Sequence, residues 1–315
     1  MSGSSFSQLQ NVLQLTYSKD LKDQQRAAID LANLVDGSVF PAVSFGPVAH
    51  ALCRLVPSTD ITVSSHSSRA LKLLILDDAL RSQASVARVS LVVCEAIKQW
   101  EDEVFCLREL LGALQTLCWD RQSVKGVLQA DIISHLIDYI QASDQEVAVL
   151  SLSIVANILS FSNTLLLQDT YGVVRALEGA MPVLLEITRI SQERPQRFYS
   201  AAAIANASLH PLLLAALKEN GGLEICREIE LQSLSNLHIL GSKLGDCAQT
   251  ALYHLSDGVE GSVSLAQNKY SFKWGNKPVM ELSLVPASKH TKIILFCIVG
   301  WILLLMYTFS PLYFE

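Results

Sequence analysis

The residue types that most often perform chemistry in proteins are scattered along this chain of 315 residues. The acidic clusters Asp77-Asp78 and Glu101-Asp102-Glu103 have no base or metal ligand beside them in the sequence, which favours helix-end charges and solvated loops. The seven histidines stand apart from one another, at His50, His66, His135, His210, His238, His254 and His290. The chain has no G-x-x-x-x-G-K-[S/T], G-x-G-x-x-G, G-x-S-x-G or H-E-x-x-H motif. The sequence therefore predicts a protein that is not an enzyme and holds no cofactor.

The cysteines also lack the spacing of a chemical site. A structural zinc site needs four ligands at short paired spacings, and this chain has no C-x-x-C pair. Its seven cysteines stand singly among apolar neighbours, at Cys53, Cys94, Cys106, Cys118, Cys226, Cys247 and Cys297. We expect reduced thiols that pack as small hydrophobic side chains in a cytosolic domain, and no metal site.

Composition and charge argue against two further classes of protein, intrinsically disordered chains and nucleic-acid-binding proteins. Half of the residues are hydrophobic, so the chain can bury a large core and is not intrinsically disordered. Lys and Arg number 24 against 30 Asp and Glu, a net charge of -6. Binding to nucleic acid depends on clustered basic residues that neutralise phosphates. Nucleic acid is therefore not expected as a partner.

A long uncharged stretch lies near the end of the chain. From Ile293 to Phe309, with Trp301 near its middle, no residue carries a charge. A bilayer core requires about 17–25 mostly apolar residues. A buried helix of a soluble protein is the alternative, but such a helix normally keeps a polar side. The sequence predicts a single transmembrane helix over residues 291–310, which anchors the protein in a lipid bilayer.

The residues that flank this stretch predict its orientation. Lys289, His290 and Lys292 precede it, whereas Glu315 is the one charged residue after it. The positive-inside rule then places the large N-terminal domain in the cytosol, as in a single-pass tail-anchored protein. Tails of the mitochondrial outer membrane commonly carry basic residues after the span. Their absence favours the endoplasmic reticulum or the nuclear envelope, with the mitochondrial outer membrane as the alternative.

One pattern recurs through the rest of the chain. Each copy predicts a helix with apolar residues at i, i+3, i+4 and i+7, followed by a turn and further apolar helix. The clearest copies are at residues 27–34, 70–76, 113–117, 154–159, 203–209 and 251–255. If Asn33, Ile75, Thr116, Asn157, Asn206 and His254 are equivalent, successive copies lie 42, 41, 41, 49 and 48 residues apart. Armadillo and HEAT solenoids repeat about every 40–47 residues.

The segments between the copies also resemble parts of an armadillo repeat. Ala130–Ile140 with Asp144–Val147 resembles the second armadillo helix and the loop that opens the third. Glu178–Leu185 and Glu219–Glu224 resemble the glycine-containing bend before that second helix. The chain thus resembles the armadillo/HEAT repeat family. The resemblance implies an all-α, armadillo-like right-handed α-solenoid of about six units over residues 6–260, with a shortened first unit, and residues 261–290 as a cap or linker before the transmembrane helix.

Two further details of the repeat are predicted from the sequence. The two longer steps between copies predict expanded loops at residues 191–195 and 241–245. Pro182 suits the start of a helix, where its missing N–H costs nothing.

In the armadillo family the third helix of each unit lines a concave face, and a repeated Asn on it binds the backbone of an extended peptide. The positions of this chain that match it are Asn33, Asn157 and Asn206, and Thr116 and His254 occupy the same register in other copies. The resemblance predicts that these five residues bind a protein partner. The alternative is that the Asn side chains satisfy local backbone groups.

Two recognition modes of the family are disfavoured. Nuclear-import receptors carry Trp one turn before the Asn, where this chain has Ile29, Ser153 and Ala202. A basic groove like that of β-catenin is also not expected, because the third helices carry few charges.

The resulting functional hypothesis is a membrane-anchored scaffold or adaptor that binds a cytosolic protein through its solenoid. A second hypothesis is a co-chaperone that resembles the armadillo-type nucleotide-exchange factors of heat-shock 70. A third is a tail-anchored apoptosis regulator, suggested by Lys273-Trp274-Gly275-Asn276. The third is weak, because in that family the Trp-Gly pair begins a central helix of a compact bundle.

Overall fold

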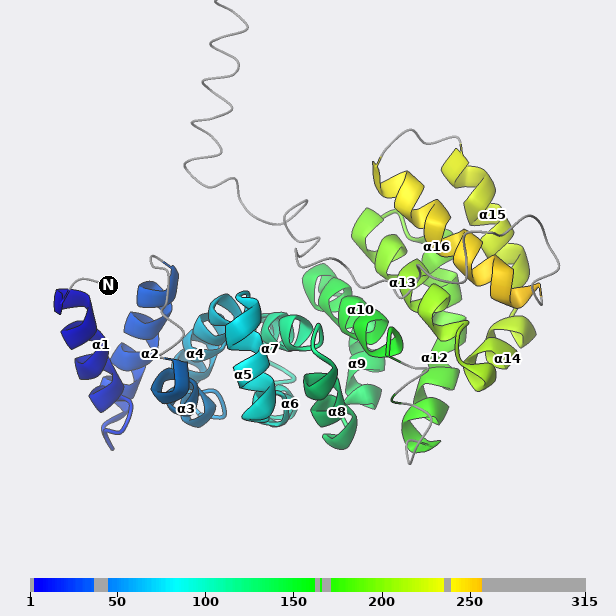
Figure 1. Ribbon diagram of the computed structural model, residues 1–315. Helices are drawn as coiled ribbons and strands as arrows, with labels where there is room; N and C mark the ends of the chain where they lie inside the picture. The colour runs from blue at the N-terminus through cyan, green and yellow to red at the C-terminus, as the bar shows by residue number, and fades with distance from the viewer. Residues whose placement is uncertain (1–2, 37–44, 162–164, 166–170, 235–238, 257–315) are drawn as a thin grey trace, which may run out of the picture. The chain divides into compact units, whose positions relative to one another are not determined.

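The computed structural model describes residues 3–36, 45–161, 165, 171–234 and 239–256 (Figure 1). Every regular element among these residues is an α-helix, which confirms an all-α chain over this part. No helix within these ranges is both long and apolar enough to cross a bilayer. The predicted cap or linker at 261–290 and the predicted transmembrane helix at 291–310 lie outside the described residues, so both stay predictions, as do the domain limits 6–260.

Six helices form the continuous part of the fold. Each of them packs against the next in the order α2, α4, α7, α10, α13, α16, and we call them the ladder helices. Their bounds are α2 Leu21–Asp36, α4 Ile61–Leu74, α7 Val104–Leu117, α10 Gln145–Leu159, α13 Arg194–Ala207 and α16 Ile239–Leu255. Each contains one copy of the sequence pattern, so the repeated stacking predicted from the spacing is confirmed. The right-handed turn of the array stays a prediction.

The other described helices pack against the ladder helices or against one another. They are α1 Gly3–Leu15, α3 Phe45–Leu55, α5 Asp78–Val86, α6 Val89–Gln99, α8 Arg121–Gln129, α9 Ile133–Ile140, α12 Tyr171–Ile190, α14 Pro211–Glu219 and α15 Gly222–Leu234. Three units show the full set of three helices, namely α5–α7, α8–α10 and α14–α16. Only α1 and α2 precede the second unit among the described residues, as the shortened first repeat predicts.

The apolar stripes of the repeats meet in one continuous core. Leu31 on α2, Leu71 on α4, and Leu110 and Leu114 on α7 are each at most 1% exposed. Complete burial of one such side chain stabilises the fold by about 1.5–3 kcal/mol. Because each inner ladder helix packs against a ladder helix on both sides, the stack itself forms the core.

In each complete unit the first and second helices meet at a residue with positive φ. These residues are Arg88 with φ 56°, Asp131 with φ 49° and Gly221 with φ 76°. At the third bend, a Cβ on Gly222 would lie 2.8 Å from the carbonyl oxygen of Leu217. The glycine bend predicted at 219–224 is therefore confirmed, and the other two bends place an Arg and an Asp in the left-handed region, at a cost of about 1–2 kcal/mol for an L-residue.

The bend predicted at 178–185 is wrong. Gly179 and Pro182 lie inside α12, a continuous helix of 20 residues. A proline within a helix removes one backbone hydrogen bond and crowds the carbonyl four residues earlier. Pro182 is exposed, so water can reach the carbonyl that loses its partner. The helix thereby continues where the other units turn.

The two predicted loops are also wrong. Only residues 191–193 separate α12 from α13, and residues 241–245 lie inside α16. The glycines at 241 and 245 each cost a helix about 1 kcal/mol. Cys247, Ala248, Ala251 and Leu255 repeat at helical spacing on the same element and are buried. Burial of this stripe outweighs the low helix propensity of the two glycines.

Candidate protein-binding face of the ladder helices

The five residues predicted to bind a partner fall on five different ladder helices, but they differ in exposure. Asn33 on α2 is exposed, and Asn157 on α10 and His254 on α16 are half-buried. Thr116 on α7 is 3% exposed and Asn206 on α13 is 2% exposed. The structure therefore leaves three of the five accessible. Their binding of a partner stays a prediction.

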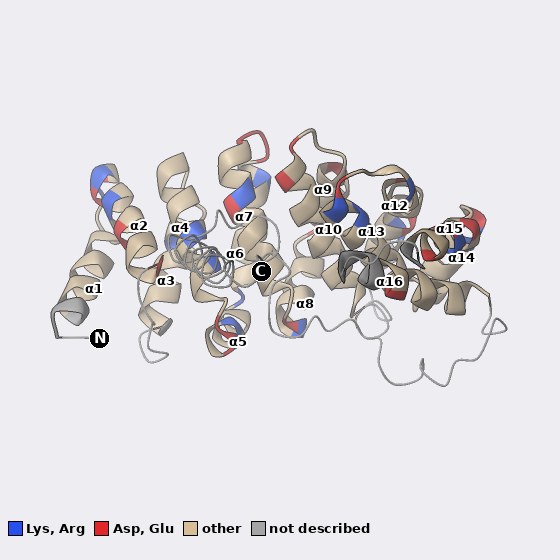
Figure 2. Ribbon diagram, turned by 90° about the horizontal axis from the view of Figure 1, so that it is seen from above, with Lys and Arg blue, Asp and Glu red and all other residues tan. Residues whose placement is uncertain are grey.

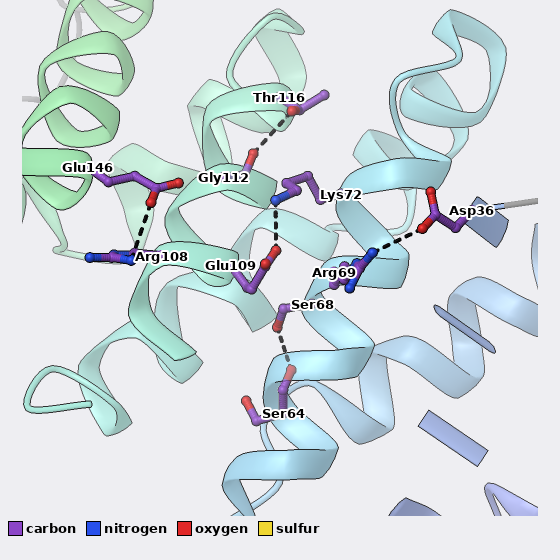
Figure 3. A network of polar contacts seen from close by, with 10 residues as sticks. All are labelled: Asp36, Ser64, Ser68, Arg69, Lys72, Arg108, Glu109, Gly112, Thr116 and Glu146. Atoms are coloured by element: carbon purple, nitrogen blue, oxygen red, sulfur yellow. Dashed lines mark hydrogen bonds and ion pairs between the residues drawn. The ribbon is translucent and has the colours of Figure 1, made fainter. Parts of the chain in front are cut away.

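The polar groups of the two buried residues form hydrogen bonds inside the protein. The hydroxyl of Thr116 donates to the carbonyl oxygen of Gly112 at 3.1 Å, within α7 (Figure 3). Asn206 Nδ2 donates to the carbonyl oxygen of Ala156 at 2.9 Å, which joins α13 to α10. A buried amide that satisfies a backbone carbonyl fits the alternative reading of the Asn positions given above.

The half-buried His254 differs from an ordinary surface histidine. Burial lowers its pKa below the usual value of 6.5. The folded protein therefore favours the neutral imidazole, which can both donate and accept a hydrogen bond.

A row of charged pairs joins the first four ladder helices. Arg69 on α4 pairs with Asp36 on α2 at 2.9 Å, between Nη2 and Oδ2. Lys72, one turn further along α4, pairs with Glu109 on α7 at 2.7 Å, between Nζ and Oε2 (Figure 3). Both pairs reach across a helix–helix contact rather than along one helix. They therefore tie the neighbouring repeats together.

The third link of this row connects α7 to α10. Arg108 Nε donates to Asp144 Oδ1 at 3.1 Å, and Arg108 Nη1 lies 3.5 Å from Glu146 Oε2. Asp144 is also the N-cap of α10 and accepts the backbone N–H of Val147 at 3.0 Å. The hydrogen bond from Arg108, followed by that from Val147, lowers the pKa of the Asp144 carboxyl despite its partial burial. The same hydrogen bond raises the pKa of the Arg108 guanidinium.

Gly112 allows Lys72 to reach its partner. A Cβ at this position would lie 2.8 Å from Cδ of Lys72. The aliphatic part of Lys72 therefore crosses α7 directly over the glycine, one turn from Glu109. A side chain at 112 would displace the lysine from this path.

We call the accessible surface around Asn33, Arg69, Lys72, Glu109 and Asn157 the ladder face. The residues at 146 and 157 lie on the same side of α10, because eleven residues make three helical turns. Opposite charges alternate along the face and pair with one another (Figure 2). The face therefore offers paired charges and amides rather than a field of one sign.

The charged links were missed in the sequence, although a signal for them exists. The bonded partners are 33, 37 and 36 residues apart. These separations are slightly shorter than one repeat, so opposite charges at that distance identify the contacts once the repeat is known. Among the described residues, no group of three or more His, Cys, Asp or Glu side chains is placed to hold a metal ion.

Comparison with known proteins supports the fold. No family model matches the chain, and no curated protein sequence matches it. Solved structures do match. An engineered protein has a TM-score of 0.65 and 24% identity, over 80% of this chain and 97% of its own. A designed armadillo repeat protein has a TM-score of 0.65 and 17% identity, over 78% of this chain and 99% of its own.

Two further matching structures concern recognition of a peptide or a protein. One is a designed armadillo repeat protein in complex with the peptide (KR)4, with a TM-score of 0.64 and 17% identity, over 78% of this chain and 99% of its own. The other comes from a study of a phosphorylation switch in the interaction between cadherin and beta-catenin. It has a TM-score of 0.65 and 14% identity, over 81% of this chain and 47% of its own. The chain has an armadillo-like repeat fold.

Proposed function

We propose that the protein is a membrane-anchored, non-enzymatic scaffold that binds a protein partner through its ladder face. The observation that carries this proposal is the row of six adjoining ladder helices, which presents an accessible polar surface on a fold that also holds (KR)4 in a designed protein. A repeat array gives an extended surface without a catalytic pocket, as suits recognition of a long partner segment.

The chemistry of the face favours a partner of mixed or low charge. Arg69, Lys72 and Arg108 are each already paired with a carboxylate. A highly charged partner would have to break these pairs, whereas Asn33 and Asn157 can bind the backbone of any extended segment. We propose that the partner lies along α2, α4, α7 and α10 and contacts these two amides. His254 lies on α16, at the far end of the ladder, where a longer partner would reach it.

Anchoring in a membrane is the second part of the proposal. It rests on the uncharged stretch from Ile293 to Phe309 and on the basic residues before it. The endoplasmic reticulum or nuclear envelope is the proposed location, with the N-terminal domain in the cytosol. Carbonate extraction of full-length protein tagged at its N-terminus tests this: recovery in the membrane pellet is expected, and recovery in the supernatant would contradict it.

Site-specific photo-crosslinking in cells tests the partner. A photo-reactive amino acid at position 33 or 157 of the full-length protein is expected to give the same adduct, identified by mass spectrometry. The matched control is position 125, because Lys125 is exposed on α8. Adducts of equal yield at 33, 157 and 125 would contradict binding at the ladder face. Release of nucleotide from heat-shock 70 by the purified full-length protein would instead favour the co-chaperone hypothesis.

A further inference from the structure

The edge at which α4 and α7 begin combines exposed apolar side chains with carboxylates. Phe105 is 62% exposed, Val104 43% and Ile61 36%, all within the first two residues of their helices. Glu101, Asp102 and Glu103 are exposed directly before α7 (Figure 2). We call these six residues the acidic–apolar edge.

Two hydrogen bonds show that the parts of this edge adjoin. Cys106 Sγ donates to Ser64 Oγ at 3.4 Å, which places the first turn of α7 beside the first turn of α4. Gln99 Nε2 donates to the carbonyl oxygen of Ser58 at 3.0 Å, which holds the segment before α7 against the segment before α4. The exposed apolar side chains and the three carboxylates therefore form one surface.

The carboxylates are mostly unpaired. Glu101 Oε2 lies 3.4 Å from His135 Nδ1. In the described part of the chain, neither Asp102 nor Glu103 takes part in an ion pair. Neighbouring exposed apolar side chains bordered by carboxylates suit a partner that carries apolar and basic side chains.

We propose that the acidic–apolar edge docks a protein segment in which apolar side chains are flanked by Lys or Arg. Phe105 and Val104 contact the apolar side chains, and the three carboxylates bind the basic ones. A lipid surface fits poorly, because anionic headgroups would meet three carboxylates. A second copy of the chain in a two-fold contact fits poorly as well, because the same carboxylates would face each other. Phe105 lies one turn before Glu109 on the same side of α7, so the edge borders the ladder face, but this proposal does not depend on the function proposed for that face.

Selection from a random dodecapeptide library tests the proposal. The full-length protein, held in a neutral phosphatidylcholine nanodisc, is panned in parallel with its Phe105→Ala variant. We expect the wild-type protein alone to enrich peptides in which Leu, Ile, Met or aromatic residues are flanked by Lys or Arg. Enrichment of acidic peptides, or the same peptides from both proteins, would overturn the proposal, as would the absence of any enrichment specific to the wild-type protein.

The selected peptides then give a quantitative test by fluorescence anisotropy. Phe105→Ala is expected to weaken their binding at least tenfold. The triple variant Glu101→Gln, Asp102→Asn, Glu103→Gln is expected to remove most of the salt dependence. Leu231→Ala is the matched control, because Leu231 is 69% exposed on α15, and it should leave the affinity unchanged. Equal losses in Phe105→Ala and Leu231→Ala would overturn the proposal. So would a dimer, or binding to lipid vesicles, that Phe105→Ala abolishes.

Discussion

The polar links between neighbouring ladder helices differ between the first and last parts of the array, which share one apolar core. Between α2, α4, α7 and α10 the links are ion pairs between partly exposed side chains, such as Arg69 with Asp36 and Lys72 with Glu109. Between α10 and α13 the link is the buried amide of Asn206 on a backbone carbonyl. In α13, residues 198–208 are all buried. One repeat can thus be stabilised either by adjustable surface charges or by fixed buried contacts.

The difference predicts different responses to solution conditions. Partly exposed ion pairs contribute about 0–1 kcal/mol each and weaken in salt. A buried neutral hydrogen bond is screened very little. Arg197 of α13 binds neutral groups, since its Nε donates to the carbonyl oxygen of Thr188 at 2.9 Å. The accessible part of the ladder is therefore also the part that salt and pH can loosen.

The largest expected effect is that of Asn206→Ala. This change leaves the buried carbonyl of Ala156 without its side-chain donor, and should lower the free energy of unfolding by about 2 kcal/mol. Chemical denaturation of the full-length protein measures it, at low and high salt. The loss should be the same at both salt concentrations. Asn33→Ala, which changes an exposed amide, is the control and should cost less than about 0.5 kcal/mol.

Asp144→Ala should have the next largest effect, about 1–2 kcal/mol, because it removes an N-cap and an ion pair together. Asp144→Asn keeps a good N-cap and removes only the charge, so it should cost less than about 1 kcal/mol. The folded pKa of Asp144 is lowered by Arg108. Its stabilising contribution is therefore complete above the unfolded pKa of about 3.9 and is lost as pH falls below it.

Denaturation at a series of pH values checks this assignment. The stability difference between the wild-type protein and Asp144→Asn should shrink as pH falls from 6 to 3. A difference that stays constant over this range would show that the carboxylate of Asp144 contributes nothing through its charge.

Gly221→Ala should cost about 1 kcal/mol, because alanine is strained at φ 76°. At the equivalent bend of the α5–α7 unit the protein already accepts Arg88 at φ 56°. Arg88→Gly should therefore leave stability unchanged or raise it by a few tenths of a kcal/mol. Thermal unfolding of both variants compares the two bends, and destabilisation by Arg88→Gly would show that the arginine side chain itself holds its bend.

The smallest expected effect is that of Glu109→Gln, about 0.5 kcal/mol, because the pair with Lys72 is partly exposed. The loss should disappear at 1 M salt, where the Debye length is about 3 Å. A loss of stability that persists at 1 M salt would show that this pair is not screened, as expected of a buried contact, and would contradict the assignment.

The repeat itself could be predicted from the sequence. Apolar spacing within helices and the recurring period identified all six ladder helices, because burial of one stripe per helix leaves a periodic trace. The bend at Arg88 could not be predicted, since arginine does not mark a left-handed conformation; aspartate adopts it more often, but it is also common in helices and loops, so Asp131 alone did not identify a bend. The continuous α12 was missed for a related reason. Gly179 and Pro182 permit a bend, but exposure of Pro182 also permits the helix to continue.

The candidate site was predicted less well than the fold. The register placed Asn33, Asn157 and His254 at accessible positions, but it could not show that Thr116 and Asn206 are buried, because burial depends on neighbouring repeats. The links between helices, such as Arg108 with Asp144, join residues about one repeat apart and become visible only after the repeats are aligned in space.

Hydrogen–deuterium exchange of the full-length protein at low salt and in 1 M NaCl tests the central claim most directly. The claim is that salt-sensitive charge pairs link the first four ladder helices, whereas a buried hydrogen bond links α10 to α13, on an apolar core that both parts share. Salt should speed amide exchange severalfold in α2, α4, α7 and the first turn of α10, and leave α13 unchanged. A uniform response along the ladder, or faster exchange in α13 than in α4, would contradict it.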